Sequence, residues 1–408
     1  MPISVKLFIV AACAALLTAD TPSPPPTTNT KLPTPVFGDT CAETRAPLSA
    51  ITWNVAMAPG MNPLYTERRR PITDAVRRLE YDVLCIQEAW NDIDKLAIAA
   101  ATELPPENVF AHETAGLGED EADICARHDV DTLLACTASE CEDVASEDTT
   151  LCAMQRCRAE LKLLFTRHRR CLNCLTAQVG RSIQDIAATC TTKSASRIYG
   201  GRNGMMLLSR WPLYDRDVVF LPSSYANRLV LLARVRVPGV PEPIELACTH
   251  ISSPQPIPPF HSGLATWEDE QRAQMRVVID AALTRAQDRP AIFLADMNVG
   301  GASGRMVLDY SRAAWDDLIA AGWRDPAAEA TLPFCSVCGE NTVRWSPGGP
   351  GFLLDHVVFR NPTSGVMLEP LCTDRLLDNK VKARGRDAAV IATHLSDHYA
   401  VRVKFGFR

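Results

Sequence analysis

The chain lacks two features that would direct its function towards a membrane or a long polyanion. A spanning helix needs about 18 or more consecutive apolar residues, and no run of that length occurs among the 408 residues. We therefore expect no transmembrane span. The chain also lacks a basic excess, since 42 Lys and Arg stand against 48 Asp and Glu. This balance argues against a broad nucleic-acid footprint, although bound cations can supply positive charge locally.

The N-terminus is typical of an exported protein. Met1–Lys6 carries one lysine, and an apolar run over Leu7–Leu17 follows it. This pattern predicts a signal peptide over residues 1–19. The alternative is a lipoprotein anchored at Cys13, and both interpretations predict a secreted or periplasmic protein. Residues 20–47 are rich in Pro and Thr, which predicts an extended linker.

Cysteine is abundant, with 15 residues in the chain. Cys85 and Cys248 lie within apolar strand-like runs, which favours buried free thiols. With these and Cys13 set aside, an even number remains, and in an exported chain that number favours disulfides. The twelve are Cys41, Cys125, Cys136, Cys141, Cys152, Cys157, Cys171, Cys174, Cys190, Cys335, Cys338 and Cys372. Two Cys-x-x-Cys pairs, at 171/174 and 335/338, leave a structural zinc site as an alternative.

Several short apolar runs end on a polar residue. Such runs are typical of strands buried on both faces, and α/β sheets place their sites at strand ends. The runs are 51–53 before Asn54, 83–87 before Glu88, 246–249 before His250, and 291–295 before Asp296. Helical spacing of apolar residues over 66–80 and 267–286 alternates with them. The pattern predicts an α/β or layered α+β protein.

Residues 110–197 break this alternation. Eight cysteines fall between 125 and 190, and an acidic stretch over 119–148 precedes a basic one over 156–170. We expect a Cys-rich, disulfide-braced helical insertion whose charges are solvated. The alternative is a subdomain that docks a substrate or a partner.

An ordered series of motifs resembles the endonuclease/exonuclease/phosphatase superfamily, which includes deoxyribonucleases and neutral sphingomyelinases. The series is Trp53-Asn54-Val55, Gln87-Glu88, Asn203-Gly204 with Leu208-Ser209-Arg210, Thr249-His250, Asp296-x-Asn298, Asp355 and Ser396-Asp397-His398. The resemblance implies a four-layer α-β-β-α sandwich of two mixed sheets over residues 48–408, interrupted by 110–197. It also implies a metal-dependent phosphodiesterase.

The resemblance assigns a cation and a phosphate to these residues. It implies Mg²⁺, or else Mn²⁺ or Ca²⁺, bound by Asn54, Glu88 and Asp397, and such hard cations prefer oxygen ligands. The phosphate contacts that it implies are Asn54, Asn203, His250 and Asn298.

The same resemblance assigns the proton-transfer groups. Asp296 and Asn298 lie two residues apart, so both can face one direction at a strand end. Asp296 is expected to orient the attacking water or act as its general base. Asn298 is expected to stabilise charge on the phosphate oxygens, and His250 is expected to protonate the leaving group.

His398 needs a carboxylate that fixes its tautomer, and the resemblance supplies Asp355 for this role. Asp355 lies within an apolar strand expected over Phe352–Phe359, where a carboxylate is costly unless it is paired. His356 would point to the opposite face, and we expect it to be structural or exposed.

The substrate interpretation leans towards a phospholipase C or sphingomyelinase type. Trp53-Asn54-Val55, Gln87-Glu88-Ala89-Trp90 and a helix carrying Gln271, Arg272 and Gln274 look like the neutral sphingomyelinase branch. We expect a monomer that acts on a phosphodiester, either a phospholipid head group or nucleic acid. The loop Pro254–Phe260 is the candidate for peripheral membrane contact.

Two other interpretations stay open. A secreted endonuclease would grip phosphates with Arg68–Arg70 and Arg167–Arg170, which are otherwise solvated helix faces. A non-catalytic surface interaction protein would instead use the Cys-rich insertion.

Overall fold

The computed structural model describes 41, 44–113, 125–144, 149–167, 171, 174–175, 181–192, 197–254, 264–300, 312–330, 334–344, 348–385 and 388–408. The expected signal peptide, Cys13 and most of the expected linker therefore lie outside the described residues. So does most of the loop Pro254–Phe260.

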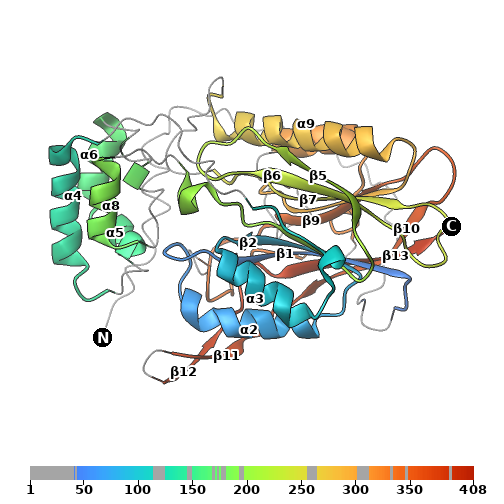
Figure 1. Cartoon of the computed structure of the whole chain (residues 1–408), viewed down its shortest axis with the longest axis horizontal. Coiled ribbons are helices and arrows are strands. Elements are labelled where there is room, and N and C mark those ends of the chain that lie inside the picture. The colour runs from blue at the N-terminus through green and yellow to red at the C-terminus, as the bar shows by residue number, and fades with distance from the viewer. Residues whose placement is uncertain are drawn as a thin grey trace.

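Two mixed sheets pack face to face (Figure 1). In order across the first sheet, the strands are β10 (Leu368–Leu376), β13 (Ala400–Phe407), β1 (Leu48–Met57), β2 (Val83–Ala89), β4 (Met206–Ser209) and β3 (Val109–Phe110). β1 and β2 are parallel, whereas β1 and β13 are antiparallel.

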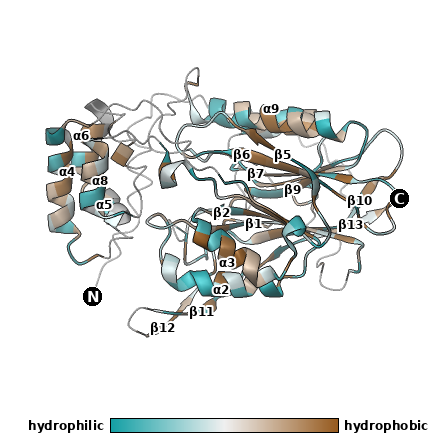
Figure 2. Cartoon of the chain, viewed as in Figure 1, coloured by the Kyte–Doolittle hydropathy of each residue, from teal (hydrophilic) through white to brown (hydrophobic). Residues whose placement is uncertain are grey.

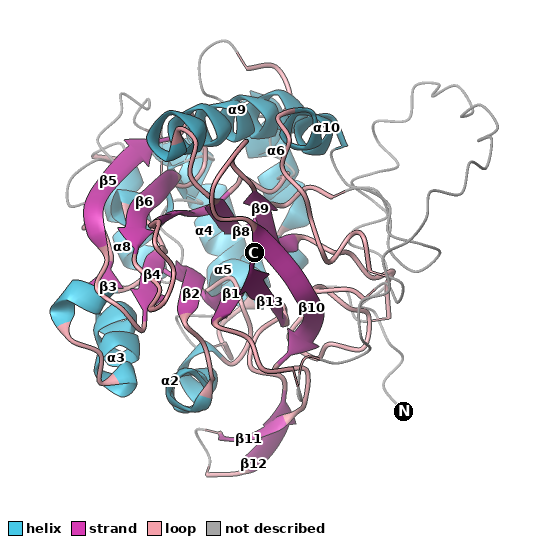
Figure 3. Cartoon of the chain, turned by 90° about the vertical axis from the view of Figure 1, so that its right-hand side faces the viewer, coloured by secondary structure: helices cyan, strands magenta, loops and turns pink. Residues whose placement is uncertain are grey.

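The second sheet has five strands and one parallel pair, β7 with β8. Its order is β5 (Tyr214–Phe220), β6 (Leu229–Val235), β7 (Ile244–His250), β8 (Ala291–Asp296) and β9 (Asp355–Arg360). A separate ribbon of β11 (Val381–Arg384) and β12 (Val390–Thr393) projects from the sandwich (Figure 3).

Helices cover the outer faces of both sheets (Figure 3). α2 (Tyr65–Arg78) and α3 (Asp92–Thr102) lie on the first sheet, while α9 (Trp267–Ala286) and α10 (Arg312–Ala320) lie on the second. Two short 3₁₀ helices, Pro106–Asn108 and Ile198–Gly201, complete the connections. The four-layer α/β architecture is therefore confirmed.

Buried apolar side chains of both sheets form one core between them. Leu207 and Val83 of the first sheet join Leu231 and Leu294 of the second in this cluster. Figure 2 shows the hydrophobic residues concentrated along the central strands. This core fixes the distance between the sheets, and so it fixes how their strand ends meet.

The expectation of free thiols at Cys85 and Cys248 is wrong, because they form a disulfide. The two residues lie on β2 and β7, on facing sides of the core, with their Cα atoms 5.6 Å apart. Apolar surroundings on each strand pointed to burial but could not show that the strands face each other.

The expected disulfides at the other twelve cysteines are confirmed. The zinc alternative is wrong, since Cys335 and Cys338 pair with each other. Cys171 and Cys174 pair with cysteines elsewhere in the chain, and so neither Cys-x-x-Cys pair offers free thiolates. Several disulfides suit an extracellular or periplasmic protein.

A group of helices lies at one end of the sandwich (Figure 1), and those that the structure describes in full belong to the Cys-rich segment. They are α4 (Arg127–Glu140), α5 (Thr149–Arg156), α6 (Arg158–Arg167) and α8 (Ile183–Cys190). Disulfides Cys125–Cys171, Cys136–Cys157, Cys141–Cys152 and Cys174–Cys190 brace them. Their core includes Trp267, the first residue of α9, which attaches the cluster to the second sheet's helical layer. That residues 110–197 are an insertion stays a prediction.

Among the helices that the structure describes, none combines the length and the apolar character that a membrane span requires.

Replacing both Cys85 and Cys248 with alanine should lower the free energy of unfolding by about 2–4 kcal/mol, because the cross-link restricts the unfolded chain. Urea unfolding followed by circular dichroism measures the change. C141A/C152A is the matched control: its short loop lies in the helical cluster, so the β-sheet transition should move less. Unchanged stability of C85A/C248A would contradict a structural role for the bond between the sheets.

Candidate active site

The polar strand ends of both sheets meet at one place. Asn54 and Glu88 come from the neighbouring parallel strands β1 and β2. His250 of β7 lies opposite Asp296 of β8, and Asp296 lies opposite Asp355 of β9. The Asn54 Nδ2 donates to Asp296 Oδ2 at 2.9 Å, which joins the ends of the two sheets by a side-chain hydrogen bond.

His398 and Asp355 form a buried pair. Nδ1 of His398 lies 2.7 Å from Asp355 Oδ2 and 3.8 Å from Asp296 Oδ2. Burial alone would lower the pKa of His398, but the two carboxylates outweigh it and raise the pKa well above its usual value. The contact occupies Nδ1 and therefore leaves Nε2 as the nitrogen available to a substrate.

A neighbouring loop sets where the strand of Asp355 begins. The strand expected over Phe352–Phe359 starts instead at Asp355, so that part of the prediction is wrong. The reason is backbone pairing: the amides of Ser336 and Val337 both donate to Phe352 O. Ser336 Oγ also accepts the amides of Leu354 and Asp355, at 3.0 and 3.1 Å.

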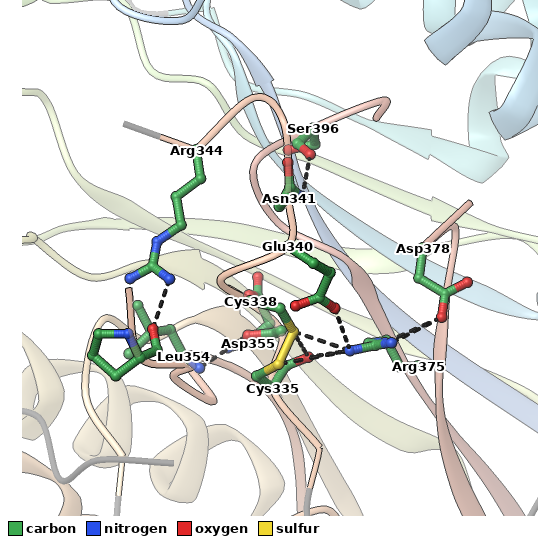
Figure 4. Close-up of a disulfide and its surroundings, with 12 residues drawn as sticks. Cys335, Cys338, Glu340, Asn341, Arg344, Leu354, Asp355, Arg375, Asp378 and Ser396 are labelled. Carbon is green, nitrogen blue, oxygen red and sulfur yellow. Dashed lines mark hydrogen bonds and ion pairs between the residues drawn. A yellow bond between two sulfur atoms is a disulfide. The ribbon is translucent and has the colours of Figure 1, made fainter. Parts of the chain in front are cut away.

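The Cys335–Cys338 disulfide closes this loop beside Asp355 (Figure 4). Arg375 Nη1 lies 3.0 Å from Cys338 Sγ, and Asn341 Nδ2 donates to Ser396 O at 2.8 Å. One short cross-linked loop thus supports both the carboxylate and the chain segment that carries its histidine.

The serine of Ser396-Asp397-His398 holds the triplet against β1. Its Oγ donates to Asn54 O at 2.7 Å and accepts the His398 amide at 3.1 Å. The hydroxyl therefore places the imidazole beside the end of β1.

Arg68 is a structural residue, which corrects both sequence interpretations of it, the phosphate-gripping cluster and the solvated helix face. It is fully buried in α2. Its guanidinium donates to Leu395 O at 2.6 Å and to Ala56 O at 2.7 Å. These bonds satisfy the carbonyls of the two segments that carry Asn54 and Ser396.

Asp296 and Asn298 form a tight turn at the end of β8. Asp296 Oδ1 accepts the Asn298 amide at 3.0 Å, and Asn298 adopts a positive φ of 47°. Asn298 Nδ2 lies 3.1 Å from His250 Nε2, which is itself 3.2 Å from Asp296 Oδ2. Gln271 of α9 donates to Asn298 O at 2.8 Å and holds the turn from behind.

The charges around Asp296 shift its pKa in the opposite direction from that of an ordinary buried carboxyl group. Burial would raise its pKa, but His250, His398 and the hydrogen bond from Asn54 lower it below the usual value. His250 behaves in the opposite way: burial first, and then the charge of Arg228, lower its pKa to about 4. At neutral pH the carboxylate is therefore ionised and His250 is neutral.

Glu88 occupies a strained backbone position, with φ at 62°. Gly204 makes that position possible, because a Cβ on residue 204 would come within 2.8 Å of Glu88 Cα. The Glu88 side chain is 22% exposed. Burial and then the charge of Asp397 raise its pKa to about 7.

The chemistry of these side chains suits a divalent cation. The charge of Asp397 disfavours ionised Glu88, and carboxylate oxygens are the donors that a hard cation prefers. Asn54 adds an amide oxygen, which in the structure accepts the Ala56 amide at 2.9 Å. Asp296, Asp355 and His398 also have ligand atoms within 4.8 Å of one another, but hydrogen bonds already engage them.

Asn203 is buried completely and anchors its own loop. Its Nδ2 donates to His112 O at 2.7 Å, and its Oδ1 accepts the Met205 amide at 3.1 Å. A direct phosphate contact by Asn203 stays a prediction.

His356 is a structural residue. The sequence had left open whether it would be structural or exposed. It is buried, with Nδ1 2.8 Å from Asp325 Oδ2. Sequence reasoning missed this partner, and it also missed Ser336, the anchoring role of Gln271, and Arg228. None of these has a motif of its own, although the Gln271 region resembled a known helix.

The family model for the Endonuclease/Exonuclease/phosphatase family matches residues 51–398. The match covers most of the chain, which therefore belongs to this family. Members are hydrolases that act on phosphoester bonds, and they are generally dependent on divalent metals. Among curated proteins, none matches the sequence.

Solved structures share the fold at low identity. SmcL is 12% identical, with a TM-score of 0.50, 88% of this chain covered and 98% of that one. Sphingomyelinase C from Streptomyces griseocarneus is 17% identical, with a TM-score of 0.48; the match covers 88% of this chain and 99% of that one. TDP2 from C. elegans is 13% identical, with a TM-score of 0.47; the match covers 88% of this chain and 75% of that one. At these identities the likeness speaks for the fold alone.

Replacing Ser336 with alanine should cost about 1–3 kcal/mol of stability, because the amides of Leu354 and Asp355 would lose a buried acceptor. The misplaced Asp355 should also lower turnover of a phosphodiester. Urea unfolding and steady-state kinetics measure the two effects. Ser364→Ala, which removes an exposed hydroxyl bonded to Asp288, is the matched control. If S336A behaved like S364A, the loop would have no part in holding Asp355.

Proposed function

We propose that this protein is a secreted, divalent-metal-dependent phosphodiesterase that drives in-line attack of water on a phosphodiester. One observation carries the proposal: Asp296 Oδ2 lies between two imidazoles, 3.2 Å from His250 Nε2 and 3.8 Å from His398 Nδ1. An ionised carboxylate beside two histidines, at the junction of two sheets, can both orient a water and manage its proton.

The proton-transfer roles follow from the hydrogen bonds. Asp296 accepts a hydrogen from the attacking water and aligns it with phosphorus. Asp355 fixes the orientation of His398, whose Nε2 then donates to the phosphate. The proton that Asp296 takes from the water passes to the neutral His250, whose Nε2 lies 3.2 Å from Asp296 Oδ2, and His250 delivers it to the departing oxygen.

The phosphate contacts surround this centre. Asn298 stabilises the negative charge that develops on the phosphate oxygens, and its contact with His250 keeps the two groups side by side. Asn54 contributes its amide from the opposite sheet, and Asn203 completes the proposed set. Positioning by both sheets holds the substrate in one orientation relative to Asp296.

Glu88, Asp397 and Asn54 are the proposed ligands of Mg²⁺, or of Mn²⁺ or Ca²⁺. A cation held there would offset the negative charge on a phosphate oxygen. Two contacts support this set: Gly204 admits the Glu88 backbone, and Asn62 Nδ2 donates to Asp397 Oδ2 at 3.2 Å.

A phospholipid head group is the proposed substrate class. The motifs at Trp53 and Trp90 support it, as does the net charge of −6. The basic helix offered for the endonuclease alternative is also weakened: Arg68 is buried on backbone carbonyls, and Arg69 pairs with Asp94 at 2.6 Å.

Asp296→Asn should lower kcat on bis-p-nitrophenyl phosphate by about 10²- to 10⁴-fold, because the water loses its base while the fold persists. EDTA should abolish wild-type activity, and Mg²⁺ or Mn²⁺ should restore it. Asp288→Asn, which alters an exposed carboxylate that accepts from Thr363, is the matched control. Near-normal turnover by D296N would reject the assigned role.

A substrate panel then tests the class. Sphingomyelin, phosphatidylcholine, plasmid DNA, RNA and inositol phosphates are compared under the same metal conditions. The proposal expects release of a phosphorylated head group from a phospholipid. Cleavage of DNA alone would favour the endonuclease alternative, and no activity on any member would favour the non-catalytic one.

A further inference from the structure

Arg228 is a buried cation whose guanidinium has no polar partner among the residues that the structure describes. The residue is only 9% exposed. Its Nε is shielded from solvent with no hydrogen-bond partner, and no carboxylate in the described part of the chain lies within ion-pair distance of its guanidinium. A buried charge is costly unless it is paired. This cost indicates that the polar partner of the arginine is a bound ligand and not another side chain of the protein.

The backbone places Arg228 beside the proposed centre. It immediately precedes β6, and its own carbonyl accepts the Leu221 amide at 2.9 Å. The next residue, Leu229, accepts a hydrogen bond from Thr249 Oγ1 at 2.6 Å. Thr249 adjoins His250, so the start of β6 lies against the functional end of β7.

An aromatic ring positions the guanidinium. Its central carbon lies 5.7 Å from the centroid of the Trp90 ring, and Trp90 is two residues beyond Glu88. Trp90 is in turn supported by Tyr199, with ring centroids 5.1 Å apart. A guanidinium stacked on a ring keeps its hydrogen donors free in its own plane.

The nearby carboxylates are engaged elsewhere. Asp296 accepts hydrogen bonds from Asn54 and from the Asn298 amide. Glu270 accepts from the hydroxyls of Ser224 and Ser252. Glu88, Asp296 and Glu270 all act electrostatically on Arg228 without pairing with it, so its donors stay available.

We propose that Arg228 is a substrate-binding residue that donates hydrogen bonds to a non-bridging oxygen of the phosphate between Glu88 and His250. This inference rests on the proposed phosphodiesterase function and adds a ligand that no motif assigned. The planar fork of arginine matches phosphate oxygens, and the anion supplies the partner that the buried cation lacks. Because the contact touches the substrate, its loss should affect KM and phosphate affinity directly.

The test compares Arg228→Gln and Arg228→Lys with the wild-type full-length protein in Mg²⁺. Calorimetric titration with inorganic phosphate gives Kd, and kinetics on bis-p-nitrophenyl phosphate give KM and kcat. R228Q should raise both Kd and KM by about 10- to 100-fold. R228K keeps the charge but not the fork, and it should fall between R228Q and wild type. Melting temperatures confirm that each variant is folded.

Arg202→Gln is the matched control, because Arg202 is a half-exposed cation already paired with Asp92 at 3.2 Å. It should leave Kd and KM within about twofold of wild type, as expected for a screened surface pair. A folded R228Q with unchanged Kd and KM overturns the proposal, as does a wild-type protein that binds no phosphate. Phosphate binding without turnover would instead reject only the proposed hydrolysis.

Discussion

Four carboxylates crowd the junction of the two sheets, and the structure depends on how their negative charge is balanced. Asp355 is offset by His398 at 2.7 Å, and Asp296 by the same imidazole at 3.8 Å together with the hydrogen bond from the Asn54 amide. Among the described residues, no Lys or Arg forms an ion pair with Glu88 or Asp397, and burial, followed by the charge of Asp397, raises the pKa of Glu88 to about 7. A divalent cation is the counter-charge that this pair lacks.

The fold keeps these groups together by satisfying the backbone around them. Arg68 caps carbonyls of two segments far apart in sequence, and Ser396 bonds the C-terminal triplet to β1. Ser336 accepts the amides of Leu354 and of Asp355, the first residue of β9. The Cys85–Cys248 disulfide joins the sheets directly behind the site. Each of these bonds joins two different elements, so the positions of the site residues depend on the packing of the sandwich.

The sequence predicted what is local and failed where partners come from distant segments. The strands that carry Glu88, His250 and Asp296 at or next to their last residue were predictable, because in each a buried apolar run stops on a polar residue. The helix over 267–286 was predicted with its observed bounds, since its apolar spacing lies within one segment. The Cys85–Cys248 bond was missed because it needs two sheets to face each other. Arg228 was missed because a single arginine before a strand has no pattern.

Thermal unfolding with and without Mg²⁺ tests the central claim, that Glu88 and Asp397 form a cation site, most directly. A ligand that binds only the folded state raises its melting temperature. The account predicts that Mg²⁺ raises the melting temperature of the wild-type protein and has little effect on Glu88→Gln, which removes one charge of the pair. An equal rise in both proteins, or no rise in the wild type, would contradict it.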